Sequence, residues 1–138
     1  MSGSVTITLA GEPVAKGRPR FAMRGHVPMV YTPAKTMNYE SALRAKAHLE
    51  MKDRPMFDGP VAVEMLAQVE VPKSWPKKKQ AAAFLGEIAP GKPDVDNYAK
   101  LVGDALNGVV WTDDAQIVDL HARKKYGQPL LVVTVRAA

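Results

Sequence analysis

The chain has 138 residues, of which 46% are hydrophobic and 24% charged, and these proportions predict one globular domain with a single core. It contains no cysteine, which excludes disulfides, thiolate-bound zinc, iron–sulfur clusters and cysteine nucleophiles; without a membrane-length apolar run or a secretory signal, we expect a cytoplasmic protein. The formal net charge of +5 is consistent with a polyanionic partner but does not identify one, because many basic proteins bind no nucleic acid.

The first half of the chain predicts a strand, a long irregular connection and a helix. Residues 5–9 alternate apolar and polar side chains, which is typical of a strand. The stretch 13–33 is rich in glycine and proline and predicts a loop or an irregular hairpin. Thr32 as N-cap and Pro33 at the first helical position then begin a helix that apolar spacing extends over 33–52.

The second half predicts a strand over 61–71, followed by a short lysine-rich helix within 72–86 that Ser74 caps. A helix over 95–106 comes next. Two further strands close the chain and are expected to form a hairpin that turns at residues 127–129, the strands being 117–126 and 130–136.

The predicted order of elements is β-α-β-α-α-β-β. This order implies an α+β fold in which helices pack on a single mixed β-sheet, and one domain that spans residues 1–138.

Charged side chains are segregated along the sequence. Residues 13–39 hold five basic residues and no acidic one, and residues 71–93 hold five lysines against a single glutamate. Five of the eight aspartates fall within residues 94–114. The basic segment 16–21 alternates charge with glycine and proline, so it either follows a phosphate backbone or is a surface loop with incidental charge.

The acidic segment has the spacing of a metal site. Asp96, Lys100 and Asp104 lie four residues apart and share one helix face, and Asp94 comes just before that helix. If Asp94, Asp96 and Asp114 converge, each pair of charges costs about 4 kcal/mol at ~4 Å and an effective dielectric of ~20. Such a cluster must protonate, separate or bind a cation, and oxygen-only ligands suit Mg²⁺ or Mn²⁺.

Simpler roles for the same residues stay open on spacing alone. Asp94 or Asp96 can serve as a helix cap. Asp96, Lys100 and Asp104 can form an exposed ladder of ion pairs. The acidic residues at 112–114 can belong to a turn without any further role.

The segment KPDVDNYAKLVGDALNGVVWTDDAQIVDLHARKKYG, residues 92–127, resembles the signature of the RusA family of Holliday junction resolvases. The shared pattern is D-x-D-N-x-x-K, then D-A-L, then D-D-x-Q-V and a basic residue on the following strand, with Ile117 in place of valine. VTITLAGEPVAKGRPRF and YTPAKTMNYE also resemble the amino-terminal region of phage-type members.

The resemblance implies a crossover junction endodeoxyribonuclease that uses Mg²⁺, with Mn²⁺ as a substitute, in a bacterial or phage-infected cell. Matched by position, Asp94, Asp96 and Asp114 are the metal-binding aspartates, and Lys100 is the catalytic lysine; all four count as catalytic. It further implies a homodimer that acts on branched DNA, a four-way junction, by paired hydrolysis of phosphodiesters during DNA recombination and repair. On this expectation, each cut would leave a 5′-phosphate and a 3′-hydroxyl.

The resemblance also assigns the basic loop to the DNA-binding face. Lys16, Arg18 and Arg20 are the leading candidates for contacts with DNA, and Lys124, on the strand after the second acidic motif, is a further one.

One segment departs from shorter members of the family. Residues 72–91, with Trp75 and the run Lys77-Lys78-Lys79, intervene before the first acidic motif and form either an added DNA-binding helix or a solvated face. Two other functions also remain open: a nuclease that prefers flaps or forks, and a catalytically silent DNA-binding protein.

Overall fold

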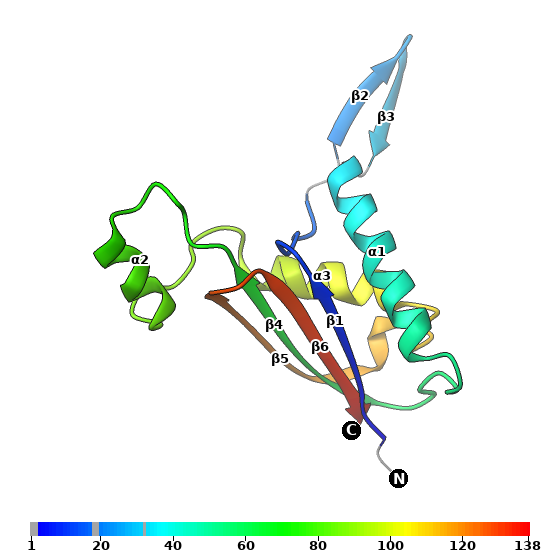
Figure 1. Ribbon diagram of the computed structural model, residues 1–138. Helices are drawn as coiled ribbons and strands as arrows, with labels where there is room; N and C mark the ends of the chain where they lie inside the picture. Colours follow the sequence, from blue (N-terminus) through cyan, green and yellow to red (C-terminus); the bar gives the residue numbers. More distant parts are fainter. Residues whose placement is uncertain (1–2, 18–19, 32) are drawn as a thin grey trace.

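The computed structural model describes residues 3–17, 20–31 and 33–138. Within them, a four-stranded mixed sheet has the order β1-β6-β4-β5, and a separate hairpin is formed by β2 and β3 (Figure 1). The elements are β1 (Val5–Ala10), β2 (Arg20–Arg24), β3 (Val27–Tyr31), α1 (Ala34–Glu50), β4 (Val61–Val69), α2 (Lys77–Phe84), α3 (Val95–Leu106), β5 (Ile117–Tyr126) and β6 (Leu130–Ala137). The predicted α+β fold, with helices packed on a mixed sheet, is confirmed.

The core lies between one face of the sheet and the helices α1 and α3. Alternate residues of the strands point into it, and they meet Leu43 and Ala47 of α1 and Leu101 of α3. Residues between them, such as Thr6 and Glu64, point to the opposite, solvent-facing side. None of the helices in the described ranges is long and apolar enough to cross a membrane.

The expected pairing of the last two strands is wrong. β5 and β6 do not pair with each other, because β4 lies between them, parallel to β5 and antiparallel to β6. The connection between β5 and β6 crosses the end of β4, where Gly127 N–H donates to Val69 O at 2.9 Å. A Cβ at Gly127 would lie 2.6 Å from Cδ of Gln68, so a larger residue at this crossing would displace the Gln68 side chain. The nearly continuous burial of β4 accounts for its central position.

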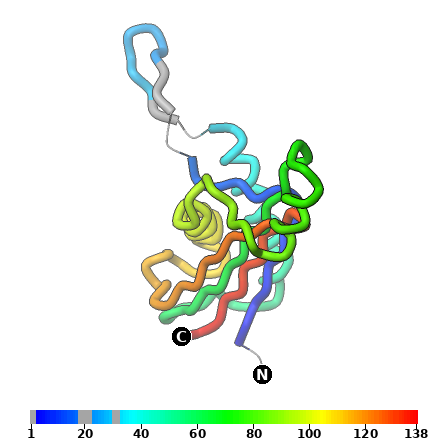
Figure 2. The backbone as a smooth tube through the Cα atoms, turned by 90° about the vertical axis from the view of Figure 1, so that its left-hand side faces the viewer, coloured from blue at the N-terminus to red at the C-terminus, as the bar shows by residue number. Residues whose placement is uncertain are grey.

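The stretch 13–33 contains the hairpin of β2 and β3, which the predicted order of elements omitted. The hairpin turns at Gly25, whose φ of 65° favours glycine. It projects from the body of the protein beyond the start of α1 (Figures 1 and 2). Pro28 obscured the second strand in the sequence, because proline is rare inside strands.

The helix ends differ in part from the predicted ones. α1 has Pro33 at its N-cap without a side-chain cap hydrogen bond, and Thr32 lies outside the described residues. α2 is capped at Pro76, so the expected Ser74 cap is wrong. α3 has the predicted bounds and is followed by Gly108, at a φ of 78°.

Candidate active site

An open pocket of about 670 Å³ lies beside the polar face of α3. All four residues predicted to be catalytic contribute to the wall of this pocket. Two come from the start of α3, one from its middle and one from a distant turn. The lining residues are Lys16, Gly17, Asp94, Asp96, Asn97, Lys100, Asp104 and Asp114.

The first turn of α3 presents Asp94 and Asp96 to this pocket. Asp94 occupies the N-cap position with an extended backbone, but its side chain makes no cap hydrogen bond. The simple capping role is therefore wrong for Asp94. The opposite face of α3 is buried through Leu101 and Val102, which fixes the helix on the sheet and turns its polar face outward.

Lys100 and Asp104 continue the polar face of α3. The ladder of ion pairs that their spacing allows is not formed, because within the described residues no salt bridge joins Lys100 to Asp96 or Asp104. Asp104 pairs instead with Lys16, at 3.1 Å. Lys100 is exposed at the pocket wall.

Asp114 comes from the 3₁₀ turn Asp114–Gln116 (η1), which a reciprocal capping box holds. The Asp113 side chain accepts a hydrogen bond from Ala115 N–H at 3.2 Å, while Gln116 Oε1 accepts from Thr112 N–H at 2.9 Å and Asp113 N–H at 3.1 Å. Asp113 thus serves the turn, and its neighbour Asp114 faces the pocket.

Gln116 also ties this turn to the segment that enters β4. Its Nε2 donates to the carbonyls of Phe57 and Gly59, both at 2.9 Å. In the sequence, this glutamine stands out only as part of the pattern D-D-x-Q-V. The signal for its role was present, because an acidic residue followed three positions later by Gln is the pattern of a capping box.

Gly103 allows the turn to approach α3. A Cβ at this position would lie 3.2 Å from Asp114 Oδ2 and 3.4 Å from Asp114 Cβ. Glycine inside a helix costs about 1 kcal/mol of stability relative to alanine. The close approach of Asp114 explains why a glycine nevertheless stands here.

The electrostatics of the turn are dominated by its two adjacent carboxyl groups. A hydrogen bond with Asp113, partial burial, and the negative charges of Asp113 and Asp104 raise the pKa of Asp114. The same hydrogen bond with Asp114, together with the Ala115 N–H, lowers the pKa of Asp113. The pocket therefore carries an excess of negative potential at Asp114, which a cation would relieve.

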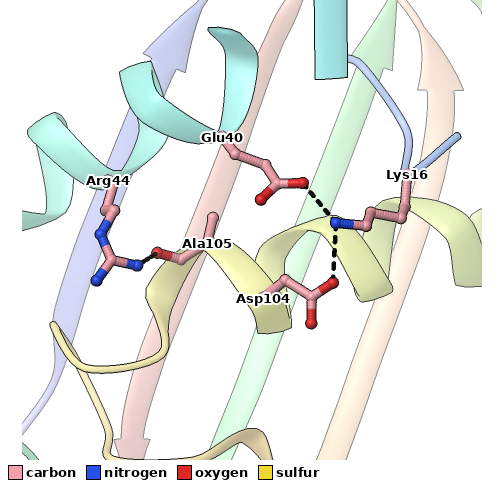
Figure 3. A network of polar contacts seen from close by, with 5 residues as sticks. All are labelled: Lys16, Glu40, Arg44, Asp104 and Ala105. Atoms are coloured by element: carbon pink, nitrogen blue, oxygen red, sulfur yellow. Dashed lines mark hydrogen bonds and ion pairs between the residues drawn. The ribbon is translucent and has the colours of Figure 1, made fainter. Parts of the chain in front are cut away.

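Lys16 is fixed at the rim of the pocket by three contacts. Its Nζ lies 2.7 Å from Glu40 Oε1 on α1 and 3.1 Å from Asp104 Oδ2 on α3 (Figure 3). Its backbone N–H donates to Asn97 O at 2.9 Å. The hydrogen bond with Glu40, joined by the one with Asp104, raises the pKa of Lys16 against the opposing effect of burial. This lysine lines the pocket with its charge compensated.

The other predicted DNA contacts have different surroundings. Lys124 Nζ donates to the carbonyls of Gly91 and of Pro93, the latter at 3.1 Å, and so anchors the segment that leads into Asp94. Arg18 lies outside the described residues, and Arg20 begins β2 on the projecting hairpin. DNA contact by these residues stays a prediction.

The three predicted metal ligands share the pocket without forming a closed ligand set. Within the part of the chain that is described, no three histidine, cysteine, aspartate or glutamate side chains are grouped closely enough to hold a metal ion as they stand. Their chemistry nevertheless fits a hard divalent cation: the donors are oxygens, and the carboxylate of Asp114 lies against a glycine and near further negative charge.

Comparison with known proteins identifies the family. Residues 10–136 match the family model described as Endodeoxyribonuclease RusA. The chain is also similar to the uncharacterized protein YqaN of Bacillus subtilis (strain 168), with 39% identity over 138 residues that cover 96% of this chain and 95% of that protein. The chain therefore belongs to the RusA family of endodeoxyribonucleases.

Proposed function

We propose that the protein is a Mg²⁺-dependent, structure-selective endodeoxyribonuclease that resolves Holliday junctions by paired phosphodiester hydrolysis. The observation that carries the proposal is the shared pocket. Asp94, Asp96 and Lys100 belong to one motif and Asp114 to another, and all four line the same cavity in a member of a nuclease family.

In this proposal Asp94, Asp96 and Asp114 hold the cation. Bound Mg²⁺ supplies neutralisation of the charge that develops on the scissile phosphate. The aspartates contribute to this only when deprotonated, and because the pKa of Asp114 is raised, protonation of this carboxylate as the pH falls would weaken metal binding.

Lys100 is the group of this chain that acts on the phosphate directly. It is exposed on the pocket wall and, within the described residues, makes no ion pair. Its ammonium can therefore donate to a phosphate oxygen, where stabilisation of developing charge is worth most in a site closed off by DNA.

The proposed assembly follows from the requirement for paired cuts in the substrate. Two symmetric incisions in a four-way junction need two sites related by a two-fold axis, so the proposed active form is a homodimer. Lys16, Arg18, Arg20 and Lys124 are proposed DNA contacts, although Lys16 and Lys124 would have to exchange contacts within the chain for phosphate oxygens.

The test is cleavage of a labelled four-way junction by the purified full chain, with Mg²⁺ and with EDTA. We expect paired nicks with Mg²⁺, none with EDTA, and slower cutting of linear duplex, of a flap and of a fork. Junction binding without metal-dependent nicking would identify a silent DNA-binding protein. Equal or faster cutting of flaps or forks would reject the junction preference and retain the nuclease.

A further inference from the structure

The insert between β4 and α3 carries a helix that the main core does not need. In Figure 1, α2 stands apart from the sheet and from the other two helices. Ala83 is the buried residue of α2, and it is not a member of the main hydrophobic core. The presence of this helix is therefore not explained by packing of the domain.

The charges on α2 are also unfavourable for the helix itself. Lys77, Lys78 and Lys79 form its first turn, all three exposed, and that turn holds no acidic residue. Cations at a helix N-terminus oppose the helix dipole. A run of lysines that weakens its own helix, in a helix that the main core does not need, indicates a role in binding.

The insert is nevertheless held in place. The Trp75 ring lies edge-to-face against Tyr126 of β5, with ring centroids 5.5 Å apart. Lys79 Nζ lies 4.0 Å from the centroid of the Trp75 ring, and Gln80 Nε2 donates to Trp75 O at 2.7 Å. The lysines of α2 thus stand on a fixed base, so little conformational entropy of the backbone is lost when a partner binds them.

A second pocket connects this base to the candidate active site. Tyr126 lines this pocket of about 600 Å³, whose wall also includes the lysines Lys35 and Lys92 and the glutamates Glu12 and Glu70. Lys16 and Gly17 line both this pocket and the one that contains the aspartates. A polyanion that lies along the insert would therefore continue toward the scissile position.

The chemistry of the surface selects the partner. Residues 73–92 hold five lysines and one acidic residue, Glu87. Lys73 lies 3.8 Å from Glu70, and among the described residues the other four make no salt bridge. The Trp75 ring already contacts Tyr126 and the Lys79 ammonium, so the exposed lysines are the groups most available to a partner. Contact would then be with phosphates and independent of sequence.

From these observations we infer that residues 73–92, which comprise most of the insert together with Lys92, form a docking surface for the sugar-phosphate backbone of a duplex arm of the DNA substrate. This inference rests on the proposed nuclease function. It adds a contact outside the catalytic pocket that holds the arm in line with it.

The test compares the full-length wild type with the variant Lys77→Gln/Lys78→Gln, which leaves Lys79 and Trp75 in place. Binding to a labelled four-way junction is measured by fluorescence anisotropy in EDTA over a range of salt concentrations. If each lysine meets a phosphate, the slope of log affinity against log salt falls by about 1.8, and the affinity falls on the order of tenfold near 0.1 M salt.

The matched control is Lys46→Gln/Lys52→Gln, which removes the same charge from the last part of α1 and from the turn that follows it; this end of α1 lies away from α2 in Figure 1. We expect it to change the slope by less than half as much. The melting temperature of Lys77→Gln/Lys78→Gln should be equal to or above that of wild type, since removal of cations from the first turn favours the helix.

The outcomes separate the two proposals. A wild type that neither binds nor cuts junctions rejects the nuclease function itself. A wild type that binds and cuts, while Lys77→Gln/Lys78→Gln matches the control in slope and affinity, overturns the docking surface alone. The docking surface is also overturned if the variant keeps the DNA slope but loses a wild-type affinity for vesicles of anionic phospholipid.

Discussion

Gly103, in the middle of α3, lies so close to Asp114 that a Cβ there would approach Asp114 Oδ2 to 3.2 Å. In Gly103→Ala, a gain in helix propensity of up to about 1 kcal/mol opposes the displacement of Asp114, so we expect the free energy of unfolding to change little. The Mg²⁺ concentration for half-maximal cleavage should rise on the order of tenfold, as it does when groups that orient a metal ligand are disturbed. Chemical denaturation and a Mg²⁺ titration measure the two effects.

Gly108→Ala is the control for this variant. Gly108 follows α3 with a φ of 78°, so alanine there is strained and should destabilise the protein by about 1 kcal/mol. Gly108 does not adjoin Asp114, so the Mg²⁺ dependence of cleavage by Gly108→Ala should match wild type. Equal Mg²⁺ dependence in Gly103→Ala would show that the close approach has no bearing on the site.

Gln116 is expected to position Asp114 through the capping box. Gln116→Ala removes the two hydrogen bonds to Phe57 O and Gly59 O and those that hold the turn, so it should cost about 2 kcal/mol of stability. It should also raise the Mg²⁺ requirement. Gln80→Ala is the matched control, because this glutamine also donates to backbone carbonyls, those of Trp75 and Lys73, but away from the pocket. If both variants alter the Mg²⁺ requirement equally, Gln116 has no special relation to Asp114.

How far the sequence could predict the structure depends on whether a signal is local. The bounds of α3 were predictable, because its apolar face repeats at helical spacing and Asn107-Gly108 ends it. The pairing of β5 was not, because a three-residue connection is typical of a hairpin and nothing local shows that β4 lies between the two strands.

The same division holds for the site. The spacing of Asp96, Lys100 and Asp104 indicated a shared helix face, and the structure places them along one pocket. The partners of Lys16 were not predictable, since Glu40 and Asp104 are distant in sequence and reach it only through the packing of α1 against α3. Lys124 likewise meets Pro93 O only because β5 passes beside the start of α3.

Tyr39 gives a prediction about stability that is independent of the nuclease function. Its hydroxyl is buried and has no hydrogen-bond partner among the described residues. We expect Tyr39→Phe to leave stability unchanged or raise it by about 1 kcal/mol, since it removes an unsatisfied polar group. Denaturant unfolding at neutral pH measures this, and a loss of more than about 1 kcal/mol would contradict it.

The same variant tests a pH dependence. Burial, followed by the charges of Tyr98 and Glu12, raises the pKa of Tyr39 above its ordinary value of 10.0. The folded state then holds this proton more tightly than the unfolded state, so stability present below about pH 10 is lost as the pH rises beyond it. Tyr39→Phe should show a shallower loss of melting temperature between neutral and strongly alkaline pH than wild type.

The basic loop offers a comparison between compensated and free charge. Lys16→Ala/Arg18→Ala/Arg20→Ala should weaken junction binding and reduce its salt dependence. Lys16→Ala alone should lower the slope by less than about 1, because that ammonium is already paired with Glu40 and Asp104 and must exchange them for phosphate. Binding measured over a salt series distinguishes the variants, and a full unit of slope lost in Lys16→Ala would mean that its ion pairs open at no cost.

Asp96→Asn separates binding from cleavage. The substitution removes one of the three proposed metal ligands from an exposed position in the first turn of α3, so the fold should be preserved. Cutting should fall below detection, while junction binding is unchanged or tighter, because less negative charge then faces the DNA. Asp53→Asn, exposed in the turn after α1, is the control with the same change of charge and should cut like wild type. Calorimetric titration with Mn²⁺ should show that Asp96→Asn also binds metal more weakly than wild type. Wild-type cleavage by this variant would remove Asp96 from the site and leave the aspartates of the pocket without their proposed common role.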